Sequence, residues 1–139
     1  MIEVDWDDPE KTIICYTFHD PWTWDEYYAT NPKRDVLFSE TNQIIDIILD
    51  FTKGKRLPPK AMTHMLKVGT WDSPQRGVVI IVGVYSMLDF MANILNSLYP
   101  QTNLKAPRPA SDLDHAHKLI KEIKRKREKA HSISSAGMM

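Results

Sequence analysis

The sequence predicts an α/β fold in which a mixed, mainly parallel sheet of about five strands is covered by helices. Residues 44–50 and 77–84 are almost continuously apolar, which is typical of strands buried on both faces of a parallel sheet. Each is followed by a segment whose apolar residues repeat at helical spacing. The chain opens with two short strand-like segments separated by a turn, which predict an N-terminal antiparallel hairpin. The alternation of strands and helices then favours right-handed crossovers between parallel strands.

The hairpin and the first helix are predicted from local patterns. Residues 2–6 alternate apolar with acidic side chains, and residues 12–18 are rich in β-branched and aromatic ones, so both ranges are predicted strands. A helix is expected to begin after Thr23, because Glu26 three residues later completes a capping box.

Proline positions divide the middle of the chain. The pair Asn31-Pro32 predicts that a second short helix follows the first and runs through about Phe38. After the 44–50 strand and a basic turn, Pro58-Pro59 suits the first turn of another helix. The predicted buried stripe of that helix consists of Met62, Met65, Leu66 and Gly69.

The last third of the chain contains two predicted helices. The first is expected to begin at Ser86 and to continue until Pro100 stops it. A short strand is predicted at 103–106, and Ser111 or Asp112 is expected to cap the final helix. The predicted buried stripe of the final helix consists of Leu113, Ala116, Leu119, Ile120 and Ile123.

Length and composition indicate one compact domain. The chain has 139 residues, of which 42% are hydrophobic and 26% charged, so we expect a single domain over 1–130 and a disordered tail over 131–139. The longest apolar run, 77–88, is too short to span a bilayer, and no signal peptide is recognisable, so a cytoplasmic location is expected. The lone Cys15 fits a reducing compartment and is expected to be a packed thiol.

The charges are unevenly distributed although the net charge is zero. Residues 1–50 contain 12 acidic and 3 basic side chains, and residues 51–139 contain 6 acidic and 15 basic ones. Such asymmetry can drive head-to-tail self-association, or can steer an anionic partner to the basic half and a cationic partner to the acidic half.

Two motifs carry a resemblance to a known family. The stretch "IIDIILDF" opening into a helix, and "GVVIIVG" followed by an amphipathic helix, resemble a STAS domain, the fold of sulfate transporter tails and anti-sigma factor antagonists. The stretches "HDPWTWDEYY" and "DFTKGKRLPP" resemble small bacterial STAS-like proteins of unassigned function. The resemblance implies a non-enzymatic protein–protein interaction module that pairs with itself or with another protein.

The sequence departs from the antagonist pattern at the switch site. Antagonist STAS domains carry a phosphorylatable Ser or Thr at the start of the helix that follows the central strand. Alignment on that strand places Pro58, Pro59, Lys60 and Ala61 at those positions. We therefore expect a module without the phosphoserine switch.

The candidate partner-binding surface is the turn after the 44–50 strand. Lys53, Lys55 and Arg56 are expected at the carboxyl end of a central strand, where ligands of open α/β sheets bind, and beside a helix N-terminus, which favours anions. The alternative is a solvated turn in which Gly54 supplies an unusual backbone angle. The predicted surface comprises Trp22, Trp24, Thr52, Lys53, Lys55, Arg56 and Lys60.

The two tryptophans have different expected roles. Trp22, just before the helix cap, is a plausible hydrophobic staple with Tyr27. Trp24 could contact a partner, because aromatic side chains dominate binding hot spots.

No catalytic residue, metal ligand or cofactor is predicted. The histidines are scattered, and "TKGK" lacks the spacing of a P-loop. The basic segment 117–129 could touch an anionic surface weakly, but it carries no interleaved aromatic residue that would favour nucleic acid. The alternative function is the binding of an anionic lipid or small apolar ligand between a helix over 87–98 and the sheet.

Overall fold

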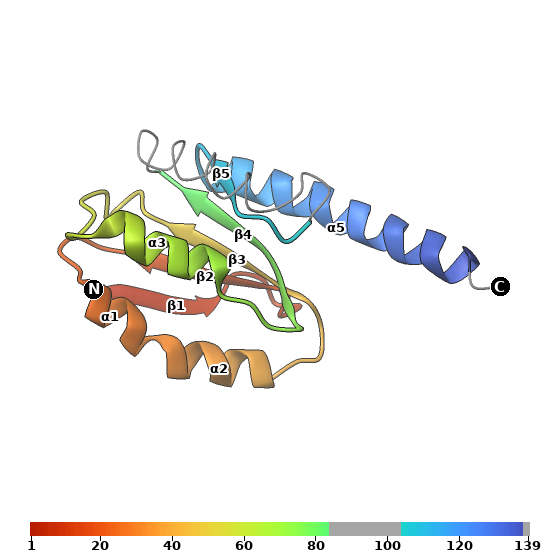
Figure 1. Ribbon diagram of the computed structural model, residues 1–139, viewed down its shortest axis with the longest axis horizontal. Coiled ribbons are helices and arrows are strands. Elements are labelled where there is room, and N and C mark those ends of the chain that lie inside the picture. Colours follow the sequence, from red (N-terminus) through yellow and green to blue (C-terminus); the bar gives the residue numbers. More distant parts are fainter. Residues whose placement is uncertain (84–103, 138–139) are drawn as a thin grey trace.

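A computed structural model describes residues 1–83 and 104–137, which form a five-stranded sheet with helices on both faces (Figure 1). The strands follow one another across the sheet in sequence order. Their bounds are Ile2–Trp6 for β1, Ile13–Phe18 for β2, Ile45–Asp50 for β3, Arg76–Val82 for β4 and Arg108–Ala110 for β5.

The pairing of the strands confirms the predicted fold class. β1 and β2 form an antiparallel hairpin, and β2, β3, β4 and β5 are parallel to one another. In the register of the central strands, Ile47 of β3 lies beside Ile14 of β2 and Val79 of β4. The central strands β3 and β4 are buried along their whole length, as their continuous apolar runs predict.

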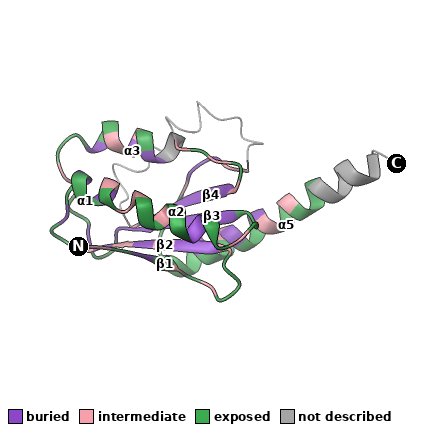
Figure 2. Cartoon of the chain, turned by 90° about the horizontal axis from the view of Figure 1, so that it is seen from below, coloured by how far each residue is buried: buried purple, intermediate pink, exposed green. Residues whose placement is uncertain are grey.

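The described helices cover both faces of the sheet (Figures 1 and 2). The helices α1, Trp24–Ala29, α2, Asn31–Ser39, and α3, Ala61–Thr70, contribute to the core on one face. The long helix α5, Leu113–Gly137, packs against the other face. Alternate residues of the central strands therefore enter different cores. Leu49 belongs to the α1–α3 side, for example, and Ile48 to the α5 side.

The predicted start of the first helices is confirmed. Thr23 is the N-cap of α1, and its hydroxyl accepts a hydrogen bond from the Glu26 N–H at 3.1 Å. α2 begins with Asn31 and Pro32, where the proline occupies the first helical turn.

α3 differs from its predicted stripe. The helix begins at Ala61 and not at the two prolines, because Lys60 adopts a left-handed backbone conformation with a φ of 62°. The buried face therefore consists of Ala61, Met65 and Val68, whereas Met62 is 40% exposed. The predictions that Met62 is buried and that the prolines belong to the helix are wrong.

One prediction for the last third of the chain is wrong, and another falls outside the described residues. The strand predicted at 103–106 is wrong in position: Leu104 begins a turn, and β5 starts at Arg108. Pro109 lies inside this strand, which an edge strand tolerates because an outward-facing position requires no N–H donor. The predicted helix over 87–98, and with it the proposed ligand site beside it, lies outside the described residues.

α5 begins as predicted and continues further. Asp112 caps the helix, since its side chain accepts a hydrogen bond from the His115 N–H at 2.8 Å. Ala116, Ile120 and Ile123 are fully buried against the sheet, as predicted, while Leu113 is 37% exposed. The backbone stays helical through Gly137, where the composition predicts a disordered tail.

Candidate functional site

The turn after β3 presents four basic side chains at the carboxyl end of a central strand. Lys53, Lys55, Arg56 and Lys60 are all exposed. None of them forms an ion pair with an acidic side chain in the part of the chain that the structure describes. Their charges therefore face solvent without a compensating carboxylate, as we expect of a surface that attracts anions.

Two buried tryptophans hold this turn from beneath. The indole N–H of Trp22 donates to the Gly54 carbonyl at 3.2 Å. The indole N–H of Trp24 donates to the carbonyls of Pro58 and Pro59 at 3.3 and 3.0 Å. These hydrogen bonds hold the backbone of the turn at Gly54 and at Pro58 and Pro59. The turn is therefore ordered in the free protein.

The tryptophans themselves offer little surface to a partner. Trp22 is 4% exposed and Trp24 is 6% exposed. The Trp22 ring packs against Phe18 and Trp24 at centroid distances of 4.7 and 4.8 Å, and Tyr27 packs against Trp24 at 6.3 Å. Trp22 and Tyr27, the predicted staple pair, therefore both pack against Trp24. Both indoles act on the candidate surface by positioning the basic turn.

Gly54 is required for close packing and not for an unusual backbone angle. A Cβ atom at this position would lie 2.7 Å from the Phe18 carbonyl oxygen and 2.8 Å from its carbon. The positive-φ glycine recorded among the described residues is Gly83, not Gly54. The interpretation of Gly54 as a purely conformational residue is thus corrected: it lets the turn approach β2.

The hydroxyl of Thr52 is already used within the site. The buried carboxylate of Asp50 accepts hydrogen bonds from the Thr52 N–H at 2.9 Å and from its hydroxyl at 2.7 Å. Asp50 therefore fixes the first residue of the turn. The structure thus brings all seven predicted site residues into one region, with Trp22 and Trp24 inside, and Thr52 and the four bases at the surface.

The histidines near this end of the sheet have structural neighbours. The His64 ring stacks on Trp24 at a centroid distance of 4.8 Å, and its Nδ1 lies 2.7 Å from the Tyr28 hydroxyl. The Nε2 atom of His19 lies 3.5 Å from a Glu3 carboxylate oxygen. Among the residues that the structure describes, neither histidine has the short contact with a carboxylate that a general acid–base pair requires.

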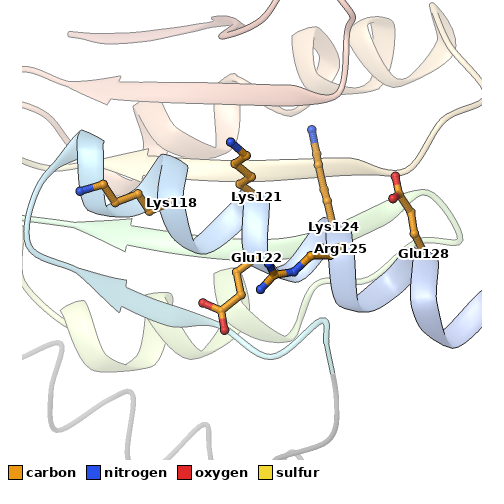
Figure 3. A pocket seen from close by; sticks show the side chains of 6 residues that line it. All are labelled: Lys118, Lys121, Glu122, Lys124, Arg125 and Glu128. Carbon is orange, nitrogen blue, oxygen red and sulfur yellow. The ribbon is translucent and has the colours of Figure 1, made fainter.

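The basic helix α5 forms a second charged surface, with a shallow hollow of about 470 Å³ along it. Figure 3 shows Lys121 and Lys124 extending to one side of the helix and Glu122 to the other. Lys126 pairs with Glu122 at 3.3 Å, and the Lys124 ammonium donates to the Thr12 hydroxyl at 2.6 Å. Some of the basic side chains of α5 therefore make contacts within the molecule. The residues lining the hollow are Lys118, Lys121, Glu122, Lys124, Arg125 and Glu128.

Within residues 1–83 and 104–137, no three His, Cys, Asp or Glu side chains gather in a way that could hold a metal ion. Among the same described residues, no helix combines the length and apolar character needed to cross a bilayer.

Sequence reasoning missed the residues that fix the basic turn. The spacing of Asp50 and Thr52 is a local signal, because an aspartate often accepts hydrogen bonds from the residue two positions later. The indole contacts of Trp22 and Trp24 join residues 32 to 35 positions apart, and no local pattern indicates them. Comparison with known proteins adds no relative: no family model, curated protein or solved structure matches the chain.

Proposed function

We propose that this chain is a non-enzymatic interaction module that binds an acidic surface of a protein partner through its basic turn. The observation that carries the proposal is the set of four exposed cations, Lys53, Lys55, Arg56 and Lys60, on a turn anchored from beneath. The partner is another protein, or a second copy that presents its acidic N-terminal half.

The anchoring matters because binding has an entropic cost. A turn that is ordered only in the complex loses conformational freedom at that moment, and affinity falls accordingly. Here the indoles of Trp22 and Trp24 and the Asp50 carboxylate already fix the backbone. The lysine and arginine head groups then contribute mainly to the rate and specificity of association, since complementary charges steer encounter.

The resemblance to STAS domains supports an interaction role without a phosphorylation switch. Pro58, Pro59, Lys60 and Ala61 carry no hydroxyl at the start of α3. The Thr52 hydroxyl is hydrogen-bonded to Asp50, which also places a negative charge beside it. A phosphate at Thr52 would be repelled by that carboxylate. On this proposal, partner binding is set by charge and shape.

A charge-reversal experiment tests the proposal. The triple variant K53E/K55E/R56E, used as bait in a quantitative pull-down from the native cell, should lose the partners that the unchanged protein recovers. A matched triple variant on α5, K118E/K121E/R125E, makes the same change in net charge at exposed positions and should retain them.

Two readouts keep the experiment decisive. Far-UV circular dichroism and thermal melting establish that both triple variants fold. Light scattering on purified protein tests whether the partner is a second copy, because self-association through this turn would disappear in K53E/K55E/R56E alone. Unchanged recovery with the turn variant, or an equal loss with both variants, would contradict the proposal.

A further inference from the structure

The two edges of the described sheet differ in their capacity to pair with another strand. β5 has three residues, Arg108–Ala110, and contains Pro109. β1 has five residues, Ile2–Trp6, none of which is proline. An edge strand presents unpaired N–H and C=O groups that can bond to an added strand, and prolines or very short strands suppress this. β1 is therefore the edge that can accept one.

The hairpin register identifies which backbone groups of β1 face away from the sheet. The His19 N–H donates to the Met1 carbonyl at 2.8 Å, and the Asp7 N–H donates to the Ile13 carbonyl at 2.8 Å. In an antiparallel pair, hydrogen-bonded and non-hydrogen-bonded positions alternate. Residues 3 and 5 therefore bond to β2, whereas the backbone groups of residues 2, 4 and 6 point outward.

One of the outward donors is already occupied. The Trp6 N–H donates to the Asp5 side chain at 2.8 Å, which confirms that it faces away from β2. Within the part of the chain that the structure describes, this leaves the N–H and C=O groups of Ile2 and Val4 as a ladder for an added strand.

A groove runs beside this edge. It has a volume of about 540 Å³ and is bounded by β1 on one side and by Ala29, Thr30 and Lys33, at the corner between α1 and α2, on the other. Figure 2 views the molecule from the side on which β1, α1 and α2 lie in Figure 1. The arrangement, an open strand edge beside a helix, is the one used by domains that bind peptides by strand addition.

The side chains around the groove define the chemistry of its occupant. Val4 is buried on the α1–α3 face, and Ile2 packs against the same core, whereas Glu3 and Asp5 are exposed on the opposite face. Lys33 on the helix wall disfavours a cation on the α1–α2 side of an added strand. An added strand would thus place apolar residues toward the helices and basic residues beside Glu3 and Asp5.

We propose that the open edge of β1 is a docking site for an extended segment of a partner protein in which basic and apolar residues alternate. The segment adds to β1 as a sixth strand. Charge complementarity selects this occupant, because Glu3 and Asp5, both exposed, are the charged side chains of β1 and lie on the face opposite α1 and α2. A second copy of this chain is disfavoured: pairing β1 with β1 would set Glu3 and Asp5 beside the same acids, and like charges on neighbouring strands repel.

The first test uses two synthetic heptapeptides, one alternating Lys and Val and the other alternating Glu and Val, in calorimetric titrations of the full chain. The Lys-Val peptide should bind and the Glu-Val peptide should not. The protein variant E3K/D5N should weaken binding by about tenfold, since two favourable cross-strand charge pairs are lost and one is reversed. Asparagine at position 5 keeps an oxygen for the Trp6 N–H. The control E122K/E128Q changes net charge equally on α5 and should alter the affinity less than about twofold.

The second test asks whether the backbone is used. Peptides N-methylated at every Val, or at every Lys, lose alternate donors. Loss of binding with only one of the two supports strand addition, and methylated Val as the inactive form indicates antiparallel pairing. In the bound state, the amide protons of Ile2 and Val4 should gain protection from exchange, while those of Glu3 and Asp5 stay as they were.

Three results would overturn the proposal. They are equal binding of the Lys-Val and Glu-Val peptides, an equal response to both N-methylated peptides, and a homodimer that the Lys-Val peptide dissociates, which would assign the edge to a second copy. The variant K53E/K55E/R56E should bind the Lys-Val peptide at least as tightly as the unchanged protein does. Failure at β1 is thus distinguishable from failure of the basic turn.

Discussion

Gly54 determines how closely the basic turn approaches β2. Its position above the Phe18 backbone leaves no room for a side chain, because a Cβ atom would lie 2.7 Å from the Phe18 carbonyl oxygen. The Phe18 backbone belongs to a paired strand and cannot move aside without cost to the sheet. The turn or the strand must therefore shift if a larger residue is introduced.

We expect Gly54→Ala to destabilise the protein by about 1–3 kcal/mol, the usual cost of overpacking. Urea unfolding followed by tryptophan fluorescence measures the change, and Trp22 reports on this turn because its indole bonds to the Gly54 carbonyl. The control Lys55→Ala, at an exposed position of the same turn, should stay within about 0.5 kcal/mol of the unchanged protein. Equal stability of both variants would contradict the tight contact.

The thiol of Cys15 should react slowly in the native protein. Burial raises the pKa of Cys15 to about 11, and a hydrogen bond with Thr17 opposes this only in part. Because the thiolate is the reactive form, the native protein should react with Ellman's reagent at pH 8 far more slowly than the urea-unfolded chain. A native rate equal to the unfolded rate would show that the thiol is neither buried nor raised in pKa.

Some residue roles could be predicted from the sequence and others could not. The exposure of Lys53, Lys55 and Arg56 follows from their charge, because an unpaired cation is costly to bury. The role of Trp24 does not follow from its neighbours in the chain, since its hydrogen-bond acceptors lie in a turn more than 30 positions away. A tryptophan, with its large ring and one N–H donor, can equally well contact a partner at the surface or support a turn from the core.

At the scale of elements, α5 is held on the sheet by a buried ion pair as well as by its apolar stripe. The Arg127 guanidinium lies 2.7 Å from a carboxylate oxygen of Asp46, which is fully buried at the start of β3. The same oxygen accepts the Val78 N–H at 2.8 Å. Arg127 thus ties the middle of α5 to both central strands.

Replacing Arg127 with Met should destabilise the protein by about 3 kcal/mol, near the lower end of the range for breaking a buried pair, because the guanidinium is partly solvated. The loss arises mainly from leaving the Asp46 carboxylate buried without a cation. Arg125→Met makes the same substitution at an exposed position of α5 and should change stability by less than about 0.5 kcal/mol. Urea unfolding followed by circular dichroism compares them, and similar midpoints for the two variants would refute the role of the pair.

Hydrophobic patterns predict the interiors of elements well and their ends less well. The β3 and β4 ranges follow from continuous apolar runs, whereas the start of α3 depends on the backbone angle of Lys60, which composition does not indicate. β5 is only three residues long and includes Pro109, so its pattern is too short to read. The pairing of Asp46 with Arg127 spans 81 positions, and only the folded chain brings them together.

At the scale of the whole molecule, the four tryptophans all belong to one layer. Trp22 and Trp24 lie in the core between the sheet and α1–α3, and Trp6 and Trp71 pack against it. The core beneath α5 is built from aliphatic side chains among the described residues. Fluorescence therefore follows one layer of the molecule, whereas helical circular dichroism also follows α5.

We expect the two signals to change together during urea unfolding. Both cores rest on the same strands, β2, β3 and β4, so neither layer can be lost without exposing the sheet that supports the other. Single domains of this size usually unfold in one cooperative step. A loss of helical signal at lower urea than the loss of fluorescence would show instead that α5 separates first.

The fold determines on which surfaces the unevenly distributed charges lie. The acidic N-terminal half supplies the β1 edge, whereas most of the bases of the C-terminal half lie on the turn after β3 and along α5. The sequence predicts the imbalance but not the faces on which it falls, because topology decides where each segment lies.

The length of α5 has a consequence for the outline of the protein in solution. Its 25 residues correspond to about 37 Å, whereas the seven residues of β4 span about 23 Å. One end of the helix must therefore overhang the sheet, as its protrusion in Figure 1 shows. Small-angle X-ray scattering should give a radius of gyration above the roughly 14 Å expected of a spherical chain of this length, with an extended shoulder in the pair-distance distribution. A symmetric, bell-shaped distribution would mean that the helix is shorter or folded back.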